Sequence, residues 1–174
     1  QSPFGVVFDD SAAYITNQES NLIQVFDLNN FTLIASIPVN NSPRGMSLSK
    51  NKNTLFVTHF SSGEISVIDT TDLSVIKTIS LGSRAGLTQA FVIDEVEAVA
   101  YVPNTMRNSD NQNLVFYNTV FPFVSIIDLN ELIHLRGDRI ALSIIDKPVG
   151  MPLEAALQNS ILYVANAASN DLTI

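Results

Sequence analysis

A four-residue motif returns four times along this chain of 174 residues. It reads YITN at 14–17, FVTH at 56–59, YVPN at 101–104 and YVAN at 163–166. Each copy lies inside a longer unit, and the first two units agree element by element, with Gly5 and Gly45 at matching positions. A repeat of roughly 40 residues is typical of architectures in which each unit packs against its neighbours. This repeat therefore constrains the fold more strongly than any single residue.

Each unit contains short segments that are typical of β-strands. The first unit holds GVVF, YIT, LIQVFD and LIASIPV, which alternate apolar and polar residues or are rich in β-branched residues. Clusters of Asn, Asp, Ser and Gly separate them, and the 17 asparagines of the chain suit many tight turns because Asn tolerates a left-handed backbone. We therefore expect four strands per unit: an inner strand after the glycine, the YVTN-like strand, the strand ending VFD or VID, and an outer strand.

The repeated motif has a structural explanation. Its aromatic and β-branched residues alternate across a pleated sheet that packs on the next unit, and its final Asn is expected to satisfy the following turn. One unit cannot bury both of its faces alone, so the motif must recur. The aspartates that close the third strand are expected to cap the turn after it. They are Asp27, Asp69 and Asp128.

The order P-x-G, YVTN, VID and outer strand resembles the YVTN-type β-propeller family, also described as surface-layer or YncE-like propellers. The resemblance covers nearly the whole chain and implies an all-β fold, a β-propeller of four-stranded blades in a ring of seven, with about three and a half blades present. The chain is then one partial propeller domain, 1–174, with exposed apolar faces at its cut edges. Its blade units are 2–41, 42–82, 83–146 and 147–174. Two departures are RAG at 84–86 in place of P-x-G, and His59 in place of Asn.

Composition excludes several classes of partner. The net charge is -8 and only nine residues are Lys or Arg, so nucleic acid and anionic membrane surfaces are not expected partners. No apolar run is long enough to span a bilayer. The chain has no cysteine, which excludes disulfides, thiolate metal sites and covalent c-type haem attachment within these residues. We expect no cofactor within this chain, although a flanking domain could carry haem.

The third unit contains an insertion of 14 residues. Asn104 and Ile126 are 22 positions apart, whereas the matching residues of the first two units are 8 apart. Insertions in propellers lie in loops on one face, where exposed aromatic residues make plausible anchors. The alternative is a loop that folds over the neighbouring blade. A second, smaller insertion holds NELIHLRG at 130–137, which is expected to form a short helical turn.

Four residues at the starts of the inner strands are expected near the central channel: Phe4, Arg44, Arg84 and Glu154. The two arginines could hold a small anion there. Neither His59 nor His134 has the spacing of a metal-ligand motif, so both are expected to be structural. The candidate binding residues come from the channel and from the first insertion. They are Arg44, Arg84, Arg107, Phe116, Tyr117, Phe121 and Phe123.

The sequence favours a binding role over an enzymatic one. It contains no G-x-S-x-G, Walker A, G-x-G-x-x-G or EF-hand pattern. The last unit resembles propellers of bacterial exported proteins, some of them associated with c-type cytochrome domains, which implies a periplasmic or cell-surface location. We expect a non-enzymatic scaffold that binds a protein or cell-envelope partner through its loop face. The alternative is the propeller part of a redox or lactone-hydrolysing enzyme, because propellers host many unrelated functions.

Overall fold

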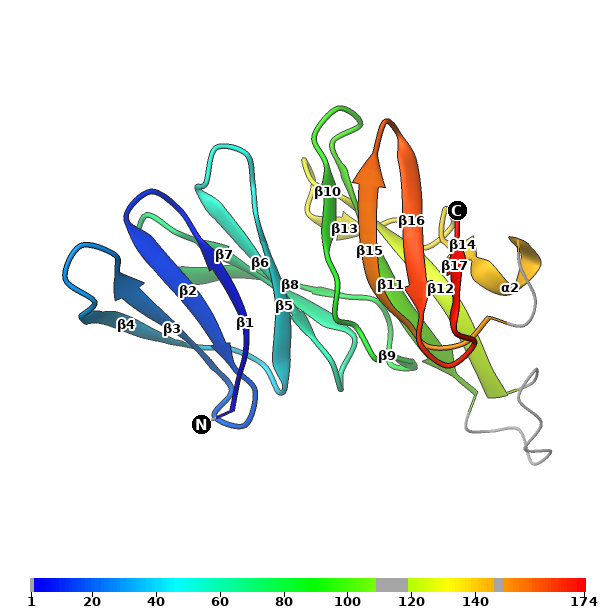
Figure 1. The fold of residues 1–174 in the computed structure, drawn as a ribbon, viewed down its shortest axis with the longest axis horizontal. Coiled ribbons are helices and arrows are strands. Elements are labelled where there is room, and N and C mark those ends of the chain that lie inside the picture. Colours follow the sequence, from blue (N-terminus) through cyan, green and yellow to red (C-terminus); the bar gives the residue numbers. More distant parts are fainter. Residues whose placement is uncertain (1, 109–118, 146–148) are drawn as a thin grey trace.

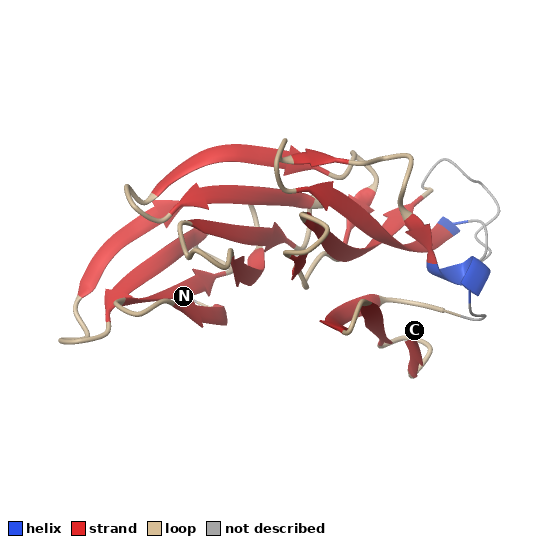
Figure 2. Cartoon of the chain, turned by 90° about the horizontal axis from the view of Figure 1, so that it is seen from above, coloured by secondary structure: helices blue, strands red, loops and turns tan. Residues whose placement is uncertain are grey.

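The computed structural model describes residues 2–108, 119–145 and 149–174, and four antiparallel sheets lie side by side along an arc (Figures 1 and 2). Blade 1 consists of β1 (Pro3–Phe8), β2 (Ala12–Asn17), β3 (Leu22–Asp27) and β4 (Leu33–Pro38). Blade 2 consists of β5 (Pro43–Leu48), β6 (Thr54–His59), β7 (Glu64–Asp69) and β8 (Ser74–Ser80). In each of these blades the strands pair in chain order, which is the meander expected of a propeller blade.

Blade 3 is larger, and blade 4 has three strands. The main strands of blade 3 are β10 (Val92–Asp94), β11 (Val99–Arg107), β12 (Val120–Asp128) and β13 (Ile133–His134). Two short strands join them: β9 (Ala85–Gly86) pairs with β11, and β14 (Ile140–Ala141) pairs with β12. The helical turn α2 (Leu142–Ile145) follows, and blade 4 consists of β15 (Pro152–Gln158), β16 (Ile161–Asn166) and β17 (Asp171–Thr173). The expected all-β fold, a β-propeller of four-stranded blades, is confirmed.

Apolar side chains between the blades form the core. Tyr14, Ile23 and Val25 of blade 1 pack on Leu55 and Val57 of blade 2. All five side chains are at most 2% exposed. Corresponding clusters fill the spaces between blades 2 and 3 and between blades 3 and 4. Burial of each apolar side chain stabilises the fold by about 1.5–3 kcal/mol, so the contacts between blades carry most of the stability.

The fourth position of the repeated motif does not cap a turn, as the sequence had suggested. Its side chain is buried and hydrogen-bonds to a polar side chain inside the neighbouring third strand. The pairs are Asn17 with Gln24, His59 with Ser66, Asn104 with Ser125, and Asn166 with Thr173. A polar group inside a sheet must be paired to avoid a desolvation cost, so each blade repeats both partners. The expected turn caps are confirmed: Asp27, Asp69 and Asp128 each accept a backbone N–H two residues further on.

The outer edge of blade 3 differs from the expectation. The segment 130–137 forms no helical turn; it contains β13, in which Ile133 and His134 pair with Asp128 and Ile127 of β12. The chain then leaves the sheet and returns as β14, where Ala141 pairs with Phe123. Because β12 is nine residues long, it can pair with two short strands: β13 pairs near its end and β14 pairs near its middle. The outer strand is therefore interrupted by a loop rather than preceded by a helix.

Both ends of the arc expose apolar side chains at positions that are buried between blades. Val6 and Phe8 on blade 1 are 59% and 68% exposed. On blade 4, Leu172 is 52% exposed, whereas Ile65 at the same register in blade 2 is fully buried. The expected exposed apolar faces are present at the two ends of the arc. None of the described helices is long and apolar enough to cross a membrane.

Candidate binding face

The candidate arginines lie at one end of the blades. We call this end the exit face; it is where β2, β6, β11 and β16 end, at the bottom of Figure 1. Arg44 follows the first residue of β5 at this end, and Arg107 ends β11. The backbone N–H of Arg107 donates to the carbonyl of Arg84 at 3.0 Å, so these two residues are neighbours. The ion pair between Lys52 and Asp10 lies in the turns at the opposite end.

Arg44 is held by aromatic rings and amides. Its guanidinium carbon lies 3.4 Å from the centre of the Phe60 ring and 4.8 Å from that of Phe4. Its Nε donates to Oε1 of Gln18 at 3.3 Å, and its Nη1 donates to Oε1 of Gln89 at 3.0 Å. Cation–π contacts and two hydrogen bonds fix the plane of the guanidinium group. Partial burial lowers the pKa of Arg44, because desolvation disfavours its charge.

The expected pairing of Arg44 with Arg84 at the channel is wrong, because the third inner strand begins further along the chain. The hydroxyl of Thr16 donates to the carbonyl of Arg44, and the hydroxyl of Thr58 donates to the carbonyl of Gln89. Gln89 therefore holds in blade 3 the position of Arg44 in blade 2. Arg84 directly precedes β9, whose two residues pair with β11: Ala85 pairs with Met106, and Gly86 pairs with Thr105. Arg84 therefore lies beside the extended hairpin.

A cavity of about 400 Å³ lies where the four inner strands converge. Its polar side chains are those of Arg44, Ser47, Gln89 and Glu154, and Phe4 borders it from blade 1. Nε2 of Gln89 donates to the carboxylate of Glu154 at 3.3 Å. The expectation that Phe4, Arg44 and Glu154 approach the channel is therefore confirmed, with Gln89 as the fourth member.

Much of the 14-residue insertion lengthens one hairpin. Strands β11 and β12 continue to pair beyond Asn104, through Thr105 with Pro122 to Arg107 with Val120. The hairpin thus projects further than those of blades 1 and 2, whose second strands end at the motif. Phe116 and Tyr117 lie outside the described residues.

The described part of the hairpin presents a mixed aromatic and basic surface. Phe121 is the cross-strand partner of Met106, and both are half-buried. The guanidinium carbon of Arg139 lies 4.6 Å from the centre of the Phe123 ring, and its Nη1 lies 3.1 Å from the sulfur of Met106. Sequence reasoning missed Arg139, because its contact with Phe123 depends on how the chain returns from β13 to β14. The register places Phe121 and Phe123 on the face of the hairpin that carries Met106, and Arg107 on the opposite face. We call Arg107, Phe121, Phe123 and Arg139 together the hairpin surface.

Both histidines are embedded in the fold, as the sequence predicts. His59 is completely buried; its Nε2 lies 2.8 Å from Oγ of Ser66 and its Nδ1 lies 3.2 Å from the carbonyl of Asn41. Burial lowers the pKa of both His59 and His134. Among residues 2–108, 119–145 and 149–174, no three His, Asp or Glu side chains gather as a metal site would require.

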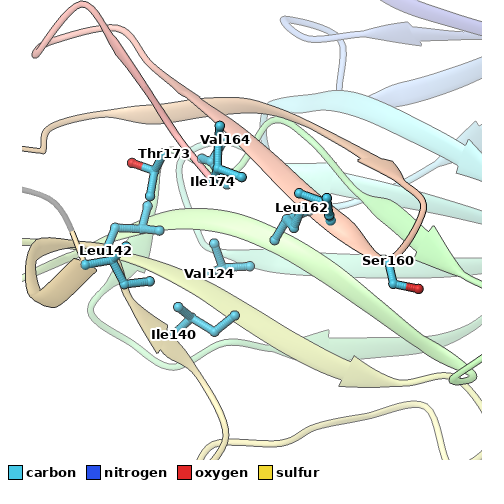
Figure 3. A pocket seen from close by; sticks show the side chains of 10 residues that line it. Val124, Ile140, Leu142, Ser160, Leu162, Val164, Thr173 and Ile174 are labelled. Carbon is cyan, nitrogen blue, oxygen red and sulfur yellow. The ribbon is translucent and has the colours of Figure 1, made fainter.

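An apolar cavity of about 250 Å³ lies between blades 3 and 4, lined by Val124, Leu142, Val164 and Ile174 among others (Figure 3). We assign no ligand to it.

The arc of meander blades and its inner-strand cavity define the class of protein as a β-propeller. No family model matches the chain, and no curated protein matches it. Solved structures share the fold. Hydrazine synthase of Kuenenia stuttgartiensis matches with a TM-score of 0.58 and 16% identity, over 93% of this chain and 60% of that one.

Two further structures match almost the whole chain. The dihydro-haem d1 dehydrogenase NirN gives a TM-score of 0.64 at 15% identity, over 97% of this chain and 36% of that one. A candidate 6-phosphogluconolactonase from Bacteroides uniformis gives 0.70 at 14% identity, over 98% and 49%. This chain therefore spans less than two thirds of each of the three structures. At such identities the likeness concerns the fold alone.

Proposed function

We propose that this chain is part of an exported, non-enzymatic β-propeller that binds a protein or cell-envelope partner through the exit face. The observation that carries the proposal is the β11–β12 hairpin, which extends three residue pairs beyond the motif of its blade. A longer paired hairpin offers a rigid platform, and its register fixes Phe121 on one face of it and Arg107 on the other. Further blades completing a ring of seven belong to the same proposal, as does a periplasmic or cell-surface location.

The chemistry of the hairpin surface suits protein recognition. Aromatic residues and Arg are the residue types enriched at binding hot spots, because they combine large apolar area with directional hydrogen bonds. Arg107 is exposed, and Arg139 lies on the Phe123 ring. A partner that places an acidic and apolar segment along this hairpin would satisfy both kinds of group.

The test replaces Arg107 and Phe121 by serine and compares partner recovery with that of the unchanged chain. Cross-linking to a cell-envelope fraction should yield a defined adduct, and the double variant should reduce it about tenfold or more. The matched control is Phe31→Ser, which removes an aromatic side chain that is 78% exposed at the opposite end of blade 1. Equal adduct from all three proteins would refute the proposal, provided that circular dichroism shows intact sheets.

The second candidate function is that of a propeller portion of a redox or lactone-hydrolysing enzyme. Its support is that similar folds include a dihydro-haem d1 dehydrogenase and a candidate 6-phosphogluconolactonase. A haem domain flanking the blades would belong to this candidate. Turnover of 6-phosphogluconolactone by the full chain, or a haem absorbance band in a longer parent protein, would favour it over the scaffold.

A further inference from the structure

The inner-strand cavity contains a positive charge that forms no ion pair within the described part of the chain. Arg44 lies in it, and no carboxylate in the described part of the chain comes within ion-pair distance of the guanidinium group. Two of its five N–H groups donate to Gln18 and Gln89. Nη2 donates to no described residue. A fixed guanidinium edge of this kind favours an acceptor that has two oxygens side by side.

The amide of Gln89 separates the charges in the cavity. Its Oε1 accepts from Arg44, and its Nε2 donates to Glu154. Both ends of the amide are therefore used, which fixes its orientation and leaves one N–H of Nε2 for a ligand. Glu154 remains a negative charge beyond it. A ligand with two or more negative charges would be repelled by Glu154 and by the net charge of -8, whereas a single carboxylate would be repelled less.

The rest of the cavity is suited to an apolar body. Val6, Met46 and Val92 line it from three different blades, and Val6 is 59% exposed. Small-ligand sites commonly combine apolar walls with a few polar groups that fix orientation. The volume of about 400 Å³ is sufficient for a small organic molecule.

We propose that the inner-strand cavity binds a small monocarboxylic acid with an apolar body, its carboxylate on the Nη edge of Arg44. This site is separate from the hairpin surface, and it goes beyond the scaffold function because it concerns a small ligand at the channel. The aromatic rings of Phe60 and Phe4 hold the guanidinium plane in position, so the side chain loses little freedom when the ligand binds.

The experiment titrates the full chain with sodium benzoate at constant ionic strength and follows the Nε–H resonances of the arginines by NMR. Benzoate should shift the resonance of Arg44 saturably and raise the melting temperature. Benzyl alcohol, which has the same ring but no charge, should do neither. Arg44→Gln should abolish the increase in melting temperature; Gln is the residue that the chain itself carries at the equivalent position, Gln89. Arg107→Gln is the matched control and should leave it unchanged.

A further variant gives an effect of opposite sign. Glu154→Gln removes the repelling charge and should tighten benzoate binding several-fold, so the proposal can be tested even if Arg44→Gln fails to fold. Inorganic phosphate should bind more weakly than benzoate. Equal stabilisation of the Arg44→Gln and unchanged proteins by benzoate would overturn the proposal. Equal shifts of Arg44 and Arg107 with phosphate and benzoate would also overturn it, since they would indicate non-specific charge screening.

Discussion

Replacing Gly45 by alanine should destabilise the protein by about 3 kcal/mol, because there is no space for a side chain between blades 2 and 3. A Cβ at this position would overlap the carbonyl oxygen of Gln89 and would lie 2.8 Å from its carbonyl carbon. The obstacle is backbone, so it cannot turn away as the end of a flexible side chain would. Urea unfolding followed by circular dichroism would measure the loss.

Local hydrogen bonds prevent the backbone from relaxing around the added methyl group. The N–H of Gly45 donates to Oγ1 of Thr58 at 3.0 Å, and the same hydroxyl donates to the carbonyl of Gln89 at 3.1 Å. Moving either chain would break this link between blades. The matched control is Ala90→Gly, at the equivalent position of blade 3, which should cost only about 1 kcal/mol. A Gly45→Ala protein within 1 kcal/mol of the unchanged one would contradict this account.

The sequence predicted the order of the main strands correctly, because each blade repeats the same alternation, but it did not predict the short strands β9 and β14. The third inner strand was expected directly after Gly86, because a glycine marks the inner strand in the first two units. The strand β10 in fact begins at Val92. Spacing to the motif is the better marker: Gly45 precedes Phe56 by 11 residues, and Ala90 precedes Tyr101 by the same number. Glycine is required where the next blade's backbone approaches closely, and that requirement can differ from one pair of blades to another.

The role of the motif's last residue could also have been found in the sequence. A polar residue recurs inside each third strand, at the third position of LIQVFD and of EISVID. Gln24 and Ser66 occupy these positions, and each bonds to the last residue of the motif. Contacts such as that between Arg139 and Phe123 could not have been found this way, because they depend on how a loop of irregular length returns to the sheet.

Replacing His59 by leucine should cost about 3 kcal/mol, because it leaves Ser66 and the carbonyl of Asn41 without their buried partner. Replacing it by asparagine should be tolerated far better, since asparagine forms the corresponding bond to Ser125 in blade 3. Thermal and urea unfolding of the two variants at pH 7.5 would separate the effect of losing the hydrogen bond from the effect of changing the side-chain volume.

The same pair of variants should reveal a dependence of stability on pH. His59 is neutral in the fold if Nδ1 donates to Asn41 and Nε2 accepts from Ser66, and burial lowers its pKa below the ordinary value of 6.5. Between the lowered pKa and 6.5 the unfolded chain binds a proton that the folded chain does not. The contribution of neutral His59 to the free energy of unfolding is therefore complete above pH 6.5. It decreases as the pH falls towards the pKa of His59 in the folded chain, by up to about 1.4 kcal/mol per pH unit.

His134, whose pKa is also lowered by burial and by Arg136 and Arg139, adds a second dependence of the same sign. His59→Asn should accordingly reduce the slope of unfolding free energy against pH between about 5 and 6.5, and His59→Asn with His134→Gln should reduce it further. If the slope stays the same after His59→Asn, His59 binds protons equally in the folded and unfolded chains, and the account of a lowered pKa is wrong. If the slope increases, the folded chain holds His59 as the imidazolium, and the bond to Ser66 runs from Nε2–H to the hydroxyl oxygen.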